Sequence, residues 1–168
     1  MPRSFDMSVE YESSVERVHR AFSDEQYWQA RLADATVGTA LLESLEVHDD
    51  HSVAVVSTLV LPREFLPAVA TQFLSGDMRI KRHETWHPVA DGKASGTIDC
   101  SILGAPATMA GKAGLSPTGA GSRLDLHATV EVRVPFVGGK LETFIGSQLT
   151  NLLIEEQRFT TTWLITEP

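Results

Sequence analysis

The sequence has little or none of several features on which whole classes of proteins depend. It has one cysteine, Cys100, so no disulfide can form within the chain, and a reducing compartment is the simplest expectation. No apolar run approaches the roughly 18 residues of a membrane-spanning helix, and the N-terminal segment lacks the apolar centre of a signal peptide. We therefore expect a cytoplasmic protein without stable membrane insertion.

Basic residues and catalytic signatures are also scarce. The 168 residues include 14 Lys and Arg against 22 Asp and Glu, a formal net charge of −8, so we predict no nucleic-acid partner. No G-x-S-x-G elbow, phosphate-binding glycine loop or C-x-x-C pair is present. We predict no catalytic residues and no cofactor. The length and the 42% of hydrophobic residues favour one domain spanning residues 1–168.

One short motif, His83-Glu84-Thr85-Trp86-His87, matches the H-E-x-x-H pattern of zinc peptidases. That pattern binds zinc on a helix, where both histidines lie on one face. Here the flanking residues alternate as in a strand, and Pro88 follows immediately. On a strand the two histidines lie roughly 13 Å apart, too far for one ion. We therefore predict no metal site.

The long segment 138–165 has the three-and-four spacing of an amphipathic helix. At 1.5 Å per residue, about 25 residues extend over roughly 38 Å and need a large surface to pack against. The predicted apolar stripe consists of Leu141, Phe144, Ile145, Leu149, Leu152, Leu153, Phe159 and Trp163.

Most of the preceding chain alternates with the period of a half-buried strand. The predicted strands cover residues 4–11, 36–47, 53–61, 78–88, 96–103, 107–115 and 123–134. Two short helices follow the first strand. One begins at Ser13 or Ser14, with Glu16 placed for a capping box with Ser13, and the other covers residues 25–33. We predict an α+β fold: a curved antiparallel sheet of about six to seven strands wrapped around the long C-terminal helix, with a ligand cavity between them.

The segment 62–76 fits neither a strand nor a polar loop. Phe65, Leu66, Val69 and Phe73 recur at helical spacing between prolines and Gly76. One interpretation is a short helix fixed on the edge of the sheet; the other is a mobile lid over a pocket.

This order of elements resembles the helix-grip fold of the START-related (SRPBCC) superfamily, which includes the birch-pollen-allergen type and the polyketide cyclases. Four stretches look like an uncharacterised actinobacterial family within it: SFDMSVEYESSVERVHRAFSD at 4–24, ETW at 84–86, VPFVGGKLE at 134–142 and RFTTTWL at 158–164. The resemblance implies a cavity between helix and sheet that holds lipids, sterols, polyketides or other apolar molecules.

Charged residues fall at positions that the pattern places inside. Arg82 and Glu84 share a face with Ile80 and Trp86, so they either form a salt bridge at a wet rim or hold the polar end of a ligand. Gln148 and Glu156 lie inside or beside the helix stripe, where they face a cavity or reach out at its edge. The predicted ligand-binding residues are Arg82, Glu84, Trp86, Phe144, Gln148, Leu152, Glu156, Phe65 and Phe73.

The leading functional hypothesis is a carrier or sensor for a small hydrophobic ligand. The alternative is a cyclase, aromatase or dehydratase that uses Glu84 with Arg82, or Glu156, as acid and base. A third is an interaction module with a filled core. Cys100 alternates with isoleucines and is expected to be a small core residue. The pattern leaves the ligand's identity and the oligomeric state open.

Overall fold

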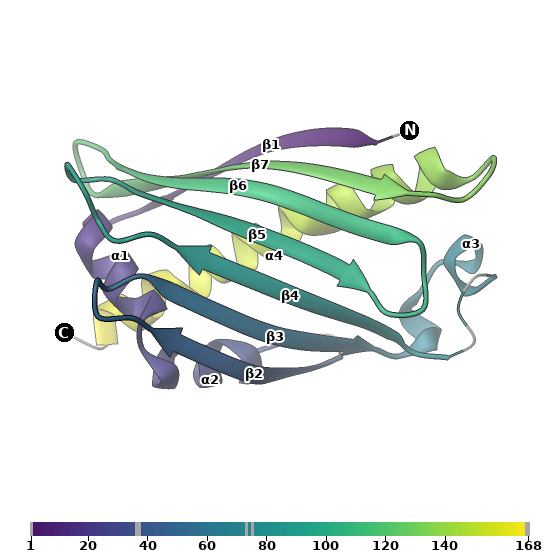
Figure 1. The fold of residues 1–168 in the computed structure, drawn as a ribbon, viewed down its shortest axis with the longest axis horizontal. Coiled ribbons are helices and arrows are strands. Elements are labelled where there is room, and N and C mark those ends of the chain that lie inside the picture. The colour runs from purple at the N-terminus through teal and green to yellow at the C-terminus, as the bar shows by residue number, and fades with distance from the viewer. Residues whose placement is uncertain (1, 36–37, 73, 75, 167–168) are drawn as a thin grey trace.

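A computed structural model describes residues 2–35, 38–72, 74 and 76–166 (Figure 1). Seven antiparallel strands form one curved sheet in the order β1-β7-β6-β5-β4-β3-β2. The strands are β1 (Arg3–Tyr11), β2 (Thr39–Val47), β3 (Val53–Leu61), β4 (Met78–Trp86), β5 (Ala94–Ile102), β6 (Ala107–Pro117) and β7 (Ser122–Val132). The predicted first residues of β2, Thr36 and Val37, lie outside the described residues.

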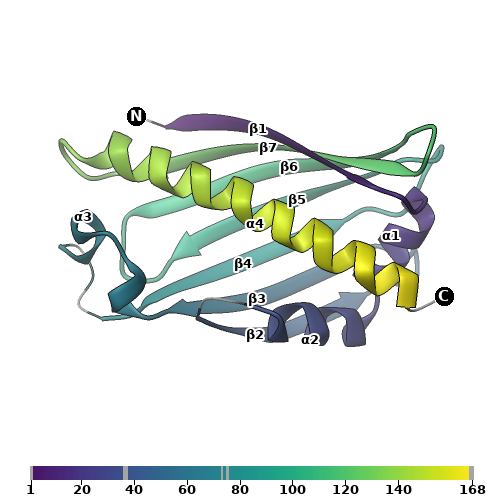
Figure 2. The ribbon, with the colours of Figure 1, turned by 180° about the vertical axis from the view of Figure 1, so that it is seen from behind.

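The helices lie on the concave side of this sheet (Figure 2). They are α1 (Val15–Phe22), α2 (Glu25–Ala33), α3 (Ala68–Thr71) and α4 (Gly138–Thr166), with a short 3₁₀ turn η1 (Arg63–Phe65). Because β1 and β2 form opposite edges of the sheet, α1 and α2 carry the chain from one edge to the other. This arrangement confirms the predicted helix-grip fold.

Caps explain where α1 and α2 begin. The Ser14 hydroxyl accepts a hydrogen bond from the Arg17 amide at 3.2 Å, and the Asp24 carboxylate accepts one from the Gln26 amide at 2.9 Å. Both bonds satisfy amides that the first turn of a helix leaves unpaired. The N-cap of α1 is therefore Ser14, and the predicted capping box with Ser13 is wrong.

Helix α4 lies so close to β1 that only glycine fits at one position. A Cβ atom on Gly146 would lie 2.2 Å from the ring of Phe5. Further along the same side, Gln157 Nε2 donates to the Glu10 carbonyl at 2.7 Å. The predicted stripe needs one correction. Phe144 and Leu152 are 37% and 40% exposed, because they lie on the helix face turned away from this contact.

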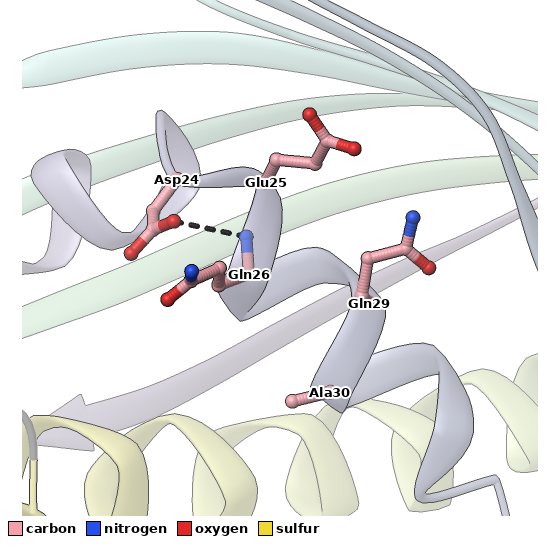
Figure 3. Close-up of a pocket in the computed structure, with 5 residues that line it drawn as sticks. All are labelled: Asp24, Glu25, Gln26, Gln29 and Ala30. Atoms are coloured by element: carbon pink, nitrogen blue, oxygen red, sulfur yellow. Dashed lines mark hydrogen bonds between the residues drawn. The ribbon is translucent and has the colours of Figure 1, made fainter.

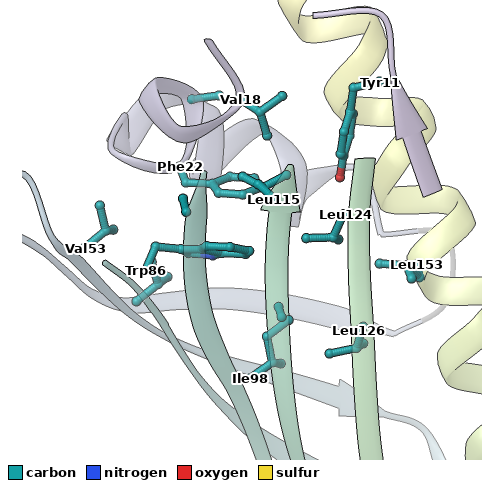
Figure 4. Packing of buried hydrophobic residues seen from close by; sticks show 14 of the residues in the cluster. Tyr11, Val18, Phe22, Val53, Trp86, Ile98, Leu115, Leu124, Leu126 and Leu153 are labelled. Atoms are coloured by element: carbon teal, nitrogen blue, oxygen red, sulfur yellow. The ribbon is translucent and has the colours of Figure 1, made fainter. Parts of the chain in front are cut away.

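Part of the larger core cluster packs at the end of the sheet near α1 (Figure 4). Trp86 is buried against Phe22, with ring centroids 5.2 Å apart, and it faces Gly96 on β5. A Cβ on Gly96 would lie 2.9 Å from the Trp86 indole, so this glycine makes room for the ring. We call this end the closed half.

The segment between β3 and β4 packs at the opposite end of the sheet. It forms η1 and α3, and Ala70 joins a second apolar cluster with Leu141 at the start of α4. Arg63 ties the segment together, because its guanidinium donates to the carbonyls of Thr71 and Leu74 at 3.1 and 2.6 Å. The structure therefore places a short packed helix here, which is compatible with both the fixed helix and the lid.

Candidate functional site

The burial of inward side chains differs on the two sides of one row of residues that crosses the middle of the sheet. The row contains Ser57 on β3, Arg82 on β4 and Cys100 on β5, which are paired in register. Toward the closed half, the inward side chains of these three strands are buried. Toward α3, they are only half-buried.

The half-buried inward side chains beyond this row form a surface that we call the open inner surface. Its members are Leu59, Leu61, Met78, Ile80 and Ile102. Helix α4 runs diagonally over the sheet, and α2 covers the sheet only at the closed end (Figure 2). Leu152 lies seven residues before Phe159 on the same flank of α4, and the Phe159 ring contacts Tyr27 of α2. Leu152 is 40% exposed.

Four charged side chains meet at the inner end of this surface: Arg31, Arg82, Glu84 and Glu156. Arg82 Nη1 lies 2.7 Å from Glu156 Oε2, and Arg82 Nη2 lies 2.9 Å from Glu84 Oε1. Arg31 Nη2 reaches the same Glu156 oxygen at 2.6 Å. We call these four residues the charge quartet; they come from α2, β4 and α4.

Aromatic and hydroxyl groups hold the Arg31 side of the quartet. The Arg31 guanidinium lies 4.6 Å from the centroid of Trp28, within the range of a cation–π contact. Arg31 Nη1 donates to the Tyr27 hydroxyl at 3.1 Å, and that hydroxyl is 2.6 Å from Thr160 Oγ1. Of the two guanidiniums that bind Glu156, that of Arg31 is therefore held in place by its own contacts.

The quartet sets the charge state of its members. Burial alone would raise the pKa of Glu156, but the neighbouring Arg31 and Arg82 outweigh burial and hold that pKa at about 2. At neutral pH Glu156 is thus ionised and engaged by both arginines, which suits neither a general acid nor a general base. Burial raises the pKa of the nearby Cys100 thiol to about 11, so the thiolate, the reactive form, is scarce.

The structure brings together three of the predicted ligand-binding residues, Arg82, Glu84 and Glu156, and adds Arg31. The others lie apart. Trp86 is in the closed half, and Phe65 on η1 is exposed. Phe144, Gln148 and Leu152 follow one another at four-residue steps along an exposed face of α4. Gln148 therefore does not lie inside the buried stripe, and Phe73 lies outside the described residues.

The H-E-x-x-H motif lies on β4 and just after it, as predicted from the alternation. His83 is exposed on the outer face of the sheet, while Glu84, its neighbour, is buried on the inner face. Across the described ranges, no group of three or more His, Cys, Asp or Glu side chains is arranged to hold a metal ion.

A surface depression on α2 lies outside the grip (Figure 3). It is lined by Asp24, Glu25, Gln26, Gln29 and Ala30. The Asp24 carboxylate already accepts the capping hydrogen bond of α2 from the Gln26 amide. None of the predicted ligand-binding residues lines this depression. We therefore assign it no role.

Comparison with known proteins places the chain in a family. The model of the family described as "Protein of unknown function (DUF2505)" matches residues 6–164. The chain belongs to this family. Uncharacterised proteins of Mycobacterium tuberculosis and Mycobacterium bovis are 49% identical over 170 residues, covering 98% of this chain and 98% of each relative.

Solved structures with little sequence identity share the fold of this DUF2505 member. A START superfamily protein from Mycobacterium smegmatis has a TM-score of 0.56 at 13% identity, covering 95% of this chain and 97% of that one. Ara h 8.0201 has a TM-score of 0.55 at 8% identity, covering 99% and 100%. These likenesses support the START-related fold. Among the helices that the structure describes, none is long and apolar enough to cross a membrane.

Sequence reasoning missed Arg31, although a signal for it exists. Arg31 lies four residues after Tyr27 and three after Trp28, so helical spacing places all three side chains on one face. Large aromatic residues such as Tyr27 and Trp28 are largely buried on average, and a buried arginine beside them needs a partner. Glu156 is that partner.

Proposed function

We propose that this protein binds a small, largely apolar molecule on the open inner surface, as a carrier or sensor. The observation that carries the proposal is the change in burial across the row Ser57, Arg82 and Cys100. Apolar side chains that face the inside of a grip and remain half-exposed form a surface that another apolar body can cover. The charge quartet lies where that body would end.

The chemistry of the quartet favours binding over the alternative of a cyclase, aromatase or dehydratase. Both Glu156 oxygens face guanidinium nitrogens, at 2.7 Å and 3.4 Å from Arg82, and its lowered pKa keeps it ionised. An acid–base catalyst needs a pKa near the working pH. A fixed and ionised quartet suits recognition of a polar group.

Substitution of Ile80 tests the proposal, because Ile80 faces inward on β4 between Leu59 and Ile102. In Ile80→Trp, the indole ring, which is larger than the isoleucine side chain, occupies the proposed ligand position. Titration with aminoanthracene, a neutral and largely apolar fluorophore, should give at least about tenfold weaker binding than in the wild type, since a well-filled site cannot take both groups. The matched control is Leu41→Trp, which adds the same ring on the outer face of β2.

Equal fluorophore binding by wild type, Ile80→Trp and Leu41→Trp would contradict the proposed site. A second measurement addresses the natural ligand. Protein purified from its native host is extracted under denaturing conditions and the extract is analysed by mass spectrometry. An apolar molecule recovered from wild type, and lost from Ile80→Trp, is the expected result.

A further inference from the structure

Three successive inward residues of β4 each bury one polar atom that has no hydrogen-bond partner among the described residues. The atoms are Arg82 Nε, Glu84 Oε2 and Trp86 Nε1. Glu84 is only 4% exposed and Trp86 1%. More than about nine in ten buried polar groups in proteins are hydrogen-bonded, so three adjacent exceptions on one strand indicate partners that the protein chain does not supply.

The remaining polar atoms of these residues are already engaged. Arg82 uses Nη1 and Nη2 on Glu156 and Glu84, and Glu84 uses Oε1 on Arg82. The charges within the quartet cancel, because two guanidiniums face two carboxylates. What remains is one acceptor, Glu84 Oε2, and two N–H donors, in a neutral setting.

We propose that Arg82, Glu84 and Trp86, three successive inward residues of β4, form the binding site for an uncharged hydroxyl group at the end of an apolar ligand. The hydroxyl donates its proton to Glu84 Oε2 and accepts a hydrogen bond from Arg82 Nε–H or Trp86 Nε1–H. The inference rests on the function proposed above and adds the chemical class of the ligand: a long-chain or polycyclic alcohol.

A carboxylate fits this row poorly. It has no proton to give to Glu84 Oε2, and it brings a third negative charge to a cluster that already balances. An additional buried charge without its own counter-ion is costly. An amine in its ammonium form fits poorly for the opposite reason: it brings a third positive charge beside Arg31 and Arg82.

The row is placed where such a ligand can reach it. The side chains of Arg82 and Glu156 are 17% and 15% exposed, so the quartet borders on accessible space. On the same strand, Ile80 comes one inward position before Arg82 and belongs to the open inner surface. The apolar body of the ligand then covers that surface while its hydroxyl enters between Arg82 and Glu84.

Competition with the bound fluorophore tests the hydroxyl directly. Dodecanol, dodecyl methyl ether and dodecanoate share one chain and differ only in the polar end. At neutral pH, dodecanol should displace aminoanthracene at a concentration about tenfold or more below that of either competitor, the range expected for one hydrogen bond to a charged group. The ether can accept from Arg82 but leaves Glu84 Oε2 unpaired.

A charge-removing variant gives the second arm. Glu84→Gln keeps the shape of the side chain but leaves the quartet with one excess positive charge, so the advantage of dodecanol over dodecanoate should fall by about tenfold or more. Glu155→Gln makes the same change at an exposed position of α4. It should leave the order in which the three competitors displace the fluorophore as in the wild type. Circular dichroism melting curves establish that both variants are folded.

The outcomes separate the two proposals. If dodecanol and its ether compete equally, or dodecanoate competes best, the hydroxyl site is overturned while the apolar binding surface stands. Equal competition is also the result if ordered water fills the row. If neither the fluorophore nor any competitor binds, the proposed function fails and this inference with it. Because the wild-type order is decisive, the test does not depend on Glu84→Gln folding.

Discussion

Glu156 is the residue on which the quartet converges. It bonds to Arg31 and Arg82 with only 15% of its side chain exposed. Moving such charges out of water costs several kcal/mol per ion. At Glu156 the attraction of Arg31 and Arg82 outweighs the cost of burying the carboxylate, as its lowered pKa shows. A folded chain therefore keeps such a cluster stable only while every charge has its counter-charge, which makes Glu156 sensitive to pH.

The pKa of Glu156 predicts a loss of stability in acid. The folded-state pKa, about 2, lies below the ordinary value of 4.5, so the stabilising charge is fully present above pH 4.5 and is lost as pH falls to 2. The shift corresponds to about 3 kcal/mol of the free energy of unfolding. Urea unfolding at a series of pH values should show this loss in the wild type.

In Glu156→Gln, the free energy of unfolding should be lower at neutral pH and should change less between pH 5 and pH 2. Glu155→Gln, on the exposed side of the same helix, is the control and should follow the wild-type pH dependence. An unchanged pH dependence in Glu156→Gln would mean that another carboxylate is responsible.

Phe136, in the loop before α4, has an unfavourable backbone and gains nothing from packing. Its φ is 68° and its side chain is fully exposed. A left-handed backbone costs an L-residue roughly 1–2 kcal/mol, whereas the greater freedom of glycine in the unfolded chain costs about 0.5–1 kcal/mol. Phe136→Gly should thus raise the free energy of unfolding by up to about 1 kcal/mol.

Phe136→Ala is the matched control, because alanine removes the exposed ring but keeps the penalty at positive φ. Thermal or urea unfolding should give no gain for alanine. A gain of equal size in both variants would place the effect in the ring and not in the backbone.

At the scale of elements, the packing of α4 depends on a single small residue. Because a Cβ on Gly146 would lie 2.2 Å from the Phe5 ring, Gly146→Ala requires the ring or α4 itself to shift. We expect the free energy of unfolding to fall by about 1–3 kcal/mol, as for other overpacked contacts. Urea unfolding measures it.

Gly139→Ala is the control within the same helix. There a Cβ meets only the tip of the Arg3 side chain, at 3.2 Å, which can move aside. The higher helix propensity of alanine should leave stability unchanged or raise it by up to about 1 kcal/mol. Equal effects of the two substitutions would argue against the close contact with Phe5.

The local sequence pattern predicted the strands and helices well, because burial of one face makes apolar residues recur every second position in a strand and every three or four in a helix. The alternation at 53–61 and the caps near residue 24 gave the bounds of β3 and α2 directly. The exposure of Phe144 and Leu152 could not be predicted in this way. Their spacing matches the buried stripe, and their environment depends on where α2 ends relative to a helix more than a hundred residues away.

At the scale of the whole molecule, the two ends of the sheet differ in what covers them. The closed half is filled by aromatic rings from α1, α2 and α4, such as Phe22, Tyr27 and Trp163. The other end is covered by α3, a four-residue helix with one buried residue, Ala70. The inward charges Arg82 and Glu84 signalled this change in the sequence, but their partner Arg31 belongs to a distant element.

This difference predicts where the fold opens first. Helix α3 is held mainly by Ala70, by the bonds from Arg63 and by its hydrogen bonds to Pro67, so its local opening costs much less than global unfolding. Amide hydrogen exchange at residues 68–71 should be orders of magnitude faster than in β4, which is bonded to a strand on each side. Arg63→Ala should speed exchange at 68–71 further and leave β4 unchanged.

Ligand binding then distinguishes a lid from a fixed cover. Leu66, Val69 and Ile102, a member of the open inner surface, all pack against the same buried cluster around Ala70. We therefore expect a ligand on that surface to contact the inner side of this segment. Saturation with dodecanol should slow exchange at 68–71, because opening must then expose the ligand as well as the segment. The turn at Asp91–Lys93, at the opposite end of the sheet, should exchange at an unchanged rate. If exchange at 68–71 is already as slow as in β4, and dodecanol leaves it so, the segment is a fixed part of the core and ligands must enter elsewhere.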